Sequence, residues 1–284
     1  MSITLYPDID LLLEELRGGI CQTLGDKLIA LYLYGSLVTG DFDHVNSDID
    51  LLAVIDGNLS EEDFARLDAM HTAFVTAHPT WHDRIEIAYL AHQALKTFRT
   101  EASPIAVISP GEPFHFKEAG KDWLINWWVV RRQGVALYGS PAQEVIDPIT
   151  DEEFQKTVLE QVEEWREWIY HLPRRKSQAY GILTMCRALH AYIVGEQVSK
   201  RQAADWAAAY FPEWAPLIHD AWSWRVAPSD DGVDHAATFA ETVRFVNFTA
   251  DYMGSEGSLR AADGNKQEAD HADDANHKHD VEKI

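Results

Sequence analysis

The chain has 284 residues, 46% of them hydrophobic, which is enough to form the cores of two ordinary domains. Its 24 Lys and Arg against 46 Asp and Glu give a formal net charge of −22, which opposes binding to nucleic acid. An acidic surface suits a cationic small molecule instead. The sequence shows no run of about 18 apolar residues and no signal-peptide pattern, so we expect a cytoplasmic protein without membrane contacts.

The first half of the chain alternates between strand and helix patterns. Short apolar runs bounded by Gly, Asn and Asp predict buried strands at residues 28–35 and 48–55. Residues 60–78 carry apolar side chains at helical spacing after a serine, which predicts a helix. Residues 83–90 alternate and return to strand. This order predicts an α/β (or α+β) domain, a small mixed sheet with helices, over residues 1–149.

The second half has the character of an all-helical domain, which we expect to span residues 150–254. Its four predicted helices occupy residues 151–172, 177–195, 199–211 and 235–253. The second of them has a serine start and a glycine stop, the usual signals of helix ends.

The C-terminal segment, residues 255–284, contains no aromatic residue and too few apolar residues to form a core. We therefore expect a disordered acidic tail. His271, His277 and His279 lie in this segment among aspartates, and we interpret them as solvated residues because no fold holds them together as metal ligands.

The stretch "LYGSLVTGDFDHVNSDIDLL" carries a pattern suited to phosphate and metal chemistry. A predicted strand ends at Gly35, where the missing side chain lets the backbone approach a phosphate, and Ser36 adds a hydroxyl donor. Ser47, Asp48 and Asp50 then open the next strand. Residues two apart in a strand point to the same face, so both carboxylates can converge on one hard cation such as Mg²⁺. The pattern therefore predicts metal-assisted phosphoryl or nucleotidyl transfer.

A third carboxylate comes from the next predicted strand, "RIEIAYL". Glu86 lies on the face of that strand opposite to Ile85 and Ile87. A partly buried carboxylate beside a metal site can take the proton of an attacking hydroxyl group. Glu86 is therefore the candidate general base.

The same residues carry a family resemblance. Gly35-Ser36 followed by Asp48-x-Asp50 resembles the signature of the DNA polymerase beta-type nucleotidyltransferase superfamily. Together with "GILTMCRALHAYIVGEQVSKRQAADW" and "TVRFVNFTADY", the chain resembles the aminoglycoside 3''-adenylyltransferases that confer streptomycin and spectinomycin resistance. The resemblance implies an N-terminal nucleotidyltransferase fold and a helical C-terminal domain, with ATP and the substrate in the cleft between them.

The resemblance also implies roles for individual residues. Asp48 and Asp50 would hold Mg²⁺, Glu86 would act as the base, and Ser36 and Ser47 would touch the phosphates of ATP.

From the second half, Arg187 and Lys200 match basic residues that reach the phosphates, and Trp128 matches an aromatic residue that stacks on the antibiotic. For Trp128, packing in a core remains an equal alternative. Where the family carries an acidic residue for streptomycin, this chain has a basic cluster at residues 174–176, followed by Ser177 and Gln178.

The function expected from the sequence is therefore transfer of AMP from ATP to a hydroxyl of a small, cationic acceptor by a monomeric enzyme. A nucleotidyltransferase with a non-antibiotic acceptor and a nucleotide-binding module without turnover remain alternatives. A second Leu-Tyr-Gly-Ser, at residues 137–140, is followed by a proline and by no Asp-x-Asp. We expect that copy to be a structural turn leading out of the first domain.

Overall fold

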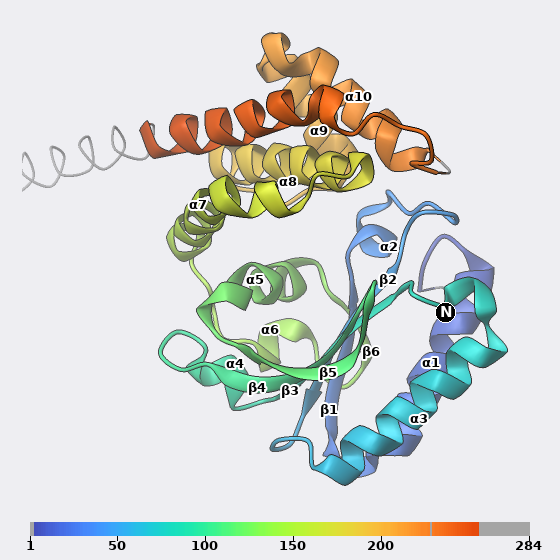
Figure 1. The fold of residues 1–284 in the computed structure, drawn as a ribbon. Helices are drawn as coiled ribbons and strands as arrows, with labels where there is room; N and C mark the ends of the chain where they lie inside the picture. The colour runs from blue at the N-terminus through green and yellow to red at the C-terminus, as the bar shows by residue number, and fades with distance from the viewer. Residues whose placement is uncertain (1–2, 228, 256–284) are drawn as a thin grey trace, which may run out of the picture.

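The computed structural model describes residues 3–227 and 229–255. A mixed sheet with flanking helices forms the first half of the chain, and a group of helices forms the second half (Figure 1). This architecture confirms the fold class predicted from the sequence. The predicted tail lies outside the described residues except for Ser255, so its disorder stays a prediction.

Six strands form one sheet in the order β5-β4-β3-β2-β1-β6. β2 and β3 are parallel, and every other neighbouring pair in the sheet is antiparallel. The strands are β1 (Leu28–Tyr34), β2 (Ile49–Ile55), β3 (Ile85–Ala91), β4 (Ser103–Ser109), β5 (Glu112–Ala119) and β6 (Val135–Tyr138).

The first three strands confirm the sequence-based predictions, whereas β4, β5 and β6 were not predicted. β4 contains a proline, β5 is mostly exposed and β6 is a short edge strand, so none of them has the buried apolar pattern of a central strand.

The helices of the first half are α1 (Pro7–Leu24), α2 (Ser36–Thr39), α3 (Glu61–Ala77), α4 (Ala94–Thr97), α5 (Leu124–Gln133) and α6 (Ala142–Val145). Those of the second half are α7 (Asp151–Trp168), α8 (Arg175–Val194), α9 (Lys200–Tyr210) and α10 (Ala215–Val226). Residues 236–255 are also helical. Ser60, Thr150 and Ser199 each form a capping box that begins a helix, which supports three of the predicted starts.

The start predicted for α8 at Ser177 is wrong by two residues. α8 begins at Arg175, and the N–H of Lys176 donates to the Asp230 carboxylate at 2.9 Å. A carboxylate from a distant loop therefore caps this helix in place of a local serine side chain, which the local sequence cannot indicate. Its predicted end is confirmed, because Gly195 adopts the left-handed conformation with φ 82°.

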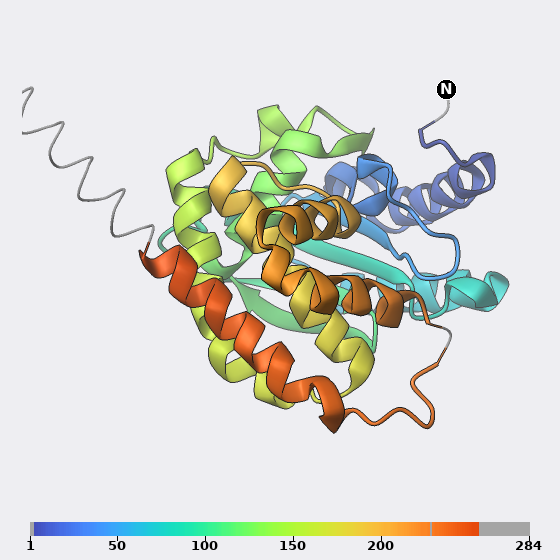
Figure 2. The same cartoon turned by 90° about the horizontal axis from the view of Figure 1, so that it is seen from above.

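Two hydrophobic cores lie on the two faces of the sheet. Leu31 and Leu33 of β1 belong to the core covered by α1 and α3, while Tyr32 and Tyr34 belong to the opposite core. That second core continues without interruption into the helices of the second half, which lie over the sheet in Figure 2. Within residues 3–227 and 229–255, no helix is long and apolar enough to cross a membrane.

Candidate active site

Three carboxylates meet where β2 and β3 begin. In the parallel register of these strands Asp50 is the partner of Glu86, and Asp48 precedes Asp50 by two positions. One oxygen from each of the three carboxylates lies within 4.8 Å of the others. Residues 50 and 86 share a strand face with the core that continues into the helical half, so this cluster points toward the second half of the chain.

The three carboxylates fit a bound divalent cation. Each is partly exposed, so water or a ligand can reach the cluster. Only oxygen donors are present, and oxygen ligands at this mutual spacing suit a hard cation such as Mg²⁺.

The electrostatics of the cluster are those of carboxylates crowded together at the edge of a core. Burial, followed by the charge of Asp48, raises the pKa of Glu86 to about 7. Burial, followed by the charges of Asp48 and Glu86, raises the pKa of Asp50 well above its ordinary value. A cation placed among them would relieve this repulsion.

Gly35 makes room for Asp50. It follows β1 with φ 73°, and a Cβ built on it would lie 1.9 Å from the Asp50 Oδ2 atom. Its neighbour Ser36 begins α2, and the buried Oγ atom of Ser36 has no hydrogen-bond partner among the described residues. The glycine is therefore required by a close approach as well as by its backbone conformation, and a polar atom beside the acids is left for a ligand.

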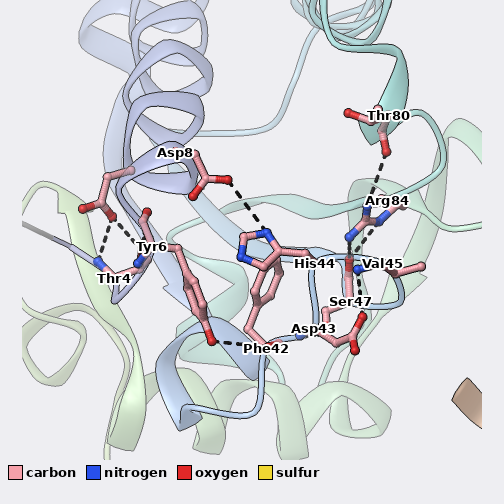
Figure 3. Close-up of polar contacts among 11 residues, drawn as sticks. Thr4, Tyr6, Asp8, Phe42, Asp43, His44, Val45, Ser47, Thr80 and Arg84 are labelled. Carbon is pink, nitrogen blue, oxygen red and sulfur yellow. Dashed lines mark hydrogen bonds and ion pairs between the residues drawn. The ribbon is translucent and has the colours of Figure 1, made fainter.

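The loop between α2 and β2 is held in place on both sides, as Figure 3 shows. The Tyr6 hydroxyl donates to the Phe42 carbonyl at 3.3 Å, and Arg84 donates through Nε to the Ser47 carbonyl at 2.9 Å. The Ser47 hydroxyl is buried and accepts a hydrogen bond from the N–H of Asp43 at 3.0 Å. These contacts position Asp48 at the end of the loop, and the Ser47 hydroxyl still has a proton to donate.

Two cations from the helical half face the acids. Arg187 of α8 interacts electrostatically with Asp50, and burial lowers its pKa. Lys200, the first residue of α9, interacts with Asp48, Asp50 and Glu86, and its Nζ atom lies 5.3 Å from the centre of the Tyr180 ring. The structure therefore brings Arg187 and Lys200 to the same place as Asp48, Asp50 and Glu86.

Arg187 is oriented by Gln197, which lies in the loop between α8 and α9. With its carbonyl oxygen turned toward the arginine, the Gln197 side chain accepts from Nε at 2.9 Å and also from Nη2. The Gln197 backbone carbonyl in turn accepts from the Gln133 side chain of α5 at 2.8 Å. A hydrogen-bonded chain thus connects the sheet half of the molecule to this guanidinium group.

A cavity of about 440 Å³ lies beside this connection. It is bounded by α2, α5 and the α8–α9 loop, and its walls include Thr39, Trp128, Gln133 and Gln197. The cavity therefore adjoins both the Ser36 helix and the residue that holds Arg187.

Trp128 does not have the free ring face that the sequence-based assignment requires. Its side chain is 2% exposed, and its ring stacks on Phe154 with centroids 3.9 Å apart. The Arg132 guanidinium covers the ring at 4.5 Å. Because both faces are occupied, the structure gives Trp128 the packing role that was its alternative, at the junction of α5 and α7.

The sequence did not single out three groups that lie near this site. Tyr180 and Arg225 interact electrostatically with Arg187, and Lys117 of β5 interacts with Glu86. No motif in the sequence marks any of the three. Their proximity follows from how α8, α10 and β5 pack around β2 and β3.

Comparison with known protein families divides the chain in the same way. The family described as "Nucleotidyltransferase domain" matches residues 13–103, and the family "Aminoglycoside adenylyltransferase, C-terminal domain" matches residues 144–251. The two matches lie in the sheet half and in the helical half, respectively.

Curated relatives match over nearly their whole length. "Aminoglycoside (3'') (9) adenylyltransferase" of Shigella flexneri is 25% identical over 259 residues, which cover 87% of this chain and 96% of that protein. A protein of the same name from Klebsiella pneumoniae is 25% identical over 247 residues, 82% of this chain and 92% of its own length.

A solved structure shares the fold. The spectinomycin adenyltransferase AAD(9) from Enterococcus faecialis, crystallised with ATP and spectinomycin, aligns with a TM-score of 0.65 at 17% identity. The alignment covers 84% of this chain and 98% of the solved one. At this identity the likeness concerns the fold alone.

Proposed function

The chain belongs to the aminoglycoside adenylyltransferase family, and on that premise we propose that it transfers AMP from ATP to a hydroxyl group of an aminoglycoside- or aminocyclitol-type antibiotic. The observation that carries this proposal is the meeting of Asp48, Asp50 and Glu86 opposite Arg187 and Lys200. Transfer of a nucleotidyl group requires acids for a metal ion on one side of the triphosphate and cations on the other, which is the arrangement observed.

Asp48 and Asp50 are the residues that would hold the divalent cation, for which we propose Mg²⁺. When bound there, the cation would neutralise phosphate charge and orient the triphosphate. Ser36 and Ser47 would donate their hydroxyl protons to phosphate oxygens, because both lie beside the acids and neither hydroxyl donates within the described residues. Arg187 and Lys200 would hold the phosphates that leave as pyrophosphate.

Glu86 would take the proton of the acceptor hydroxyl. Its pKa of about 7 in the metal-free protein suits a base that works near neutral pH. As the proton moves to Glu86, the acceptor oxygen bonds to the α-phosphorus, and the bond from that phosphorus to the bridging oxygen of the β-phosphate breaks. The products are the O-adenylylated acceptor and pyrophosphate.

The start of α8 argues against a carboxylate at the position where the family binds streptomycin. Gln178 is fully buried, and its amide donates to the carbonyls of Pro173 and His235 at 2.6 and 2.8 Å. Its side-chain oxygen accepts from Thr238 and Thr242. Because every polar atom of this amide serves to hold residues 236–255 against α8, we favour an acceptor of the spectinomycin type over streptomycin.

The test is a panel assay with purified protein and Mg-ATP. Streptomycin, spectinomycin and other aminoglycosides are supplied separately, and each product is identified by mass. We expect an AMP adduct of spectinomycin that Asp50→Asn abolishes, and a Glu86→Gln protein that keeps its affinity for ATP but loses turnover at least about 100-fold. If no antibiotic gains AMP, the acceptor class is wrong; if Asp50→Asn retains pyrophosphate release, the metal site is wrong.

A further inference from the structure

A third cation, Arg225, lies with Arg187 and Lys200 near the end of α10. The charge of Arg225 acts on both of these residues, and it also acts on Asp43 in the loop between α2 and β2. In Figure 1 the C-terminal end of α10 lies above that loop. Arg225 is therefore placed at the junction of the two halves, on the side of the cleft formed by the helices.

The packing of α10 explains this placement. Trp222 lies under the Arg201 guanidinium of α9, 4.9 Å from it, and Trp224 lies under the Arg175 guanidinium of α8, at 4.5 Å. Residues three apart share a helix face, so Arg225 lies on the side of α10 that Trp222 turns toward the start of α9. Lys200 is the first residue of that helix.

None of the three cations has a carboxylate partner in an ion pair within residues 3–227 and 229–255. Arg187 is bound by the neutral Gln197 amide, and Lys200 lies over the Tyr180 ring. This is unusual in a chain with 46 acidic residues, where most arginines near the surface have a carboxylate to pair with.

The three cations also repel one another. Burial, followed by the charges of Arg225 and Arg187, lowers the pKa of Lys200 to about 8, although Asp48 and Asp50 act in the opposite direction. Half-buried like charges without a counter-ion weaken a fold, so such a cluster is typical of a site that an anion completes.

We propose that Arg225 is a third phosphate-binding residue, which contacts the part of the triphosphate that leaves as pyrophosphate. This inference rests on the proposed function, and it adds to it a residue that no motif in the chain marks. Arg225, Arg187 and Lys200 supply three positive charges to a leaving group that carries three to four negative ones. The planar guanidinium of Arg225 can bind two phosphate oxygens at once. Its position facing the Asp43 loop assigns it to the outer end of the cleft.

The experiment measures equilibrium binding of pyrophosphate and of AMP, with Mg²⁺ and without acceptor, by calorimetry. We expect Arg225→Gln to weaken pyrophosphate binding roughly 10- to 100-fold, the usual range for loss of a charged hydrogen-bonding partner. AMP lacks the leaving phosphates, so its affinity should change by less than about threefold. Arg225→Lys should recover part of the lost affinity, because it restores the charge without the planar fork.

Arg201→Gln is the matched control. It removes the same charge from the same helix junction, but Arg201 is exposed and pairs with Asp205. We expect Arg201→Gln to bind pyrophosphate within about twofold of the wild type. The melting temperature of each variant shows whether it is folded.

The outcomes separate this proposal from the proposed function. If Arg225→Gln binds pyrophosphate as Arg201→Gln does, or loses AMP and pyrophosphate equally, Arg225 is not a leaving-group contact. Arg187→Gln tests the general placement of the triphosphate. If it weakens pyrophosphate binding while Arg225→Gln does not, the proposal for Arg225 fails and the proposed function stands. If neither variant changes binding, both proposals fail.

Discussion

Replacing Gly35 by alanine should disable the site by displacing Asp50. The added Cβ would lie 1.9 Å from Asp50 Oδ2 and 2.7 Å from its Cγ, whereas ordinary van der Waals contact begins at 3.4 Å. Subtracting 1.9 from 3.4 leaves about 1.5 Å, which the carboxylate or the backbone must move. Misplacement of a reacting group by about 1 Å can lower a rate roughly 100-fold. We therefore expect pyrophosphate release by Gly35→Ala to fall by at least about 100-fold.

The chain offers a control with the same backbone conformation. Gly40 has φ 80°, close to the φ 73° of Gly35, but nothing lies within 4 Å of a Cβ built there. Alanine in the left-handed region costs about 1–2 kcal/mol at either position. Gly40→Ala should therefore lose stability, measured by chemical denaturation, and keep its turnover within about threefold.

Two results would refute this reasoning. If Gly35→Ala retained more than a third of the wild-type turnover, the position of Asp50 would not matter to the reaction. If Gly40→Ala lost as much turnover as Gly35→Ala, backbone strain near α2, and not the collision with Asp50, would be the cause.

Three further predictions concern stability. Because Glu86 has its pKa raised to about 7, the native state keeps a proton that the unfolded chain releases near pH 4.5, so metal-free protein should lose up to about 3 kcal/mol of unfolding free energy between pH 5 and 7.5. Denaturation in EDTA should show a flatter profile for Glu86→Gln, and an unchanged profile would contradict the assignment. Burial lowers the pKa of His71, whose Nε2 atom meets the Tyr89 hydroxyl, to about 4, so stability should fall by up to about 3 kcal/mol as the pH drops from 6.5 to 4, and less in His71→Gln. Gly139→Ala would place a Cβ 2.2 Å from the Ile29 carbonyl oxygen, so the melting temperature should fall while turnover per folded molecule stays unchanged; a selective loss of turnover would show that the second Leu-Tyr-Gly-Ser also serves the site.

The two copies of Leu-Tyr-Gly-Ser show how context decides what one tetrapeptide does. The glycine of the first copy makes room for the Asp50 carboxylate, and the glycine of the second lies against the backbone of β1. In the second copy the Ser140 carbonyl accepts a hydrogen bond from the Tyr32 hydroxyl at 2.9 Å. Both glycines have positive φ, so only the Asp-x-Asp that follows the first copy distinguishes the two in the sequence.

The residues with strong local signals were predictable from the sequence. β1, β2 and β3 are short, apolar and bounded by turn residues, and α3, α7 and α9 begin at Ser or Thr capping boxes, so local physical chemistry specifies them. The period of two in a strand is likewise a local property of the backbone, and it is sufficient to place Asp48 and Asp50 on one face.

The tertiary structure alone decided what faces those acids. The parallel register of β2 and β3 makes Asp50 the neighbour of Glu86, and strands separated by a helix carry no local record of their register. Arg225 reaches the site because α10 packs on α8 and α9, and Trp128 is withheld from it because Phe154 and Arg132 cover its ring. The sequence determined which chemical groups are present and on which face of a strand they lie, whereas long-range packing determined which of them meet.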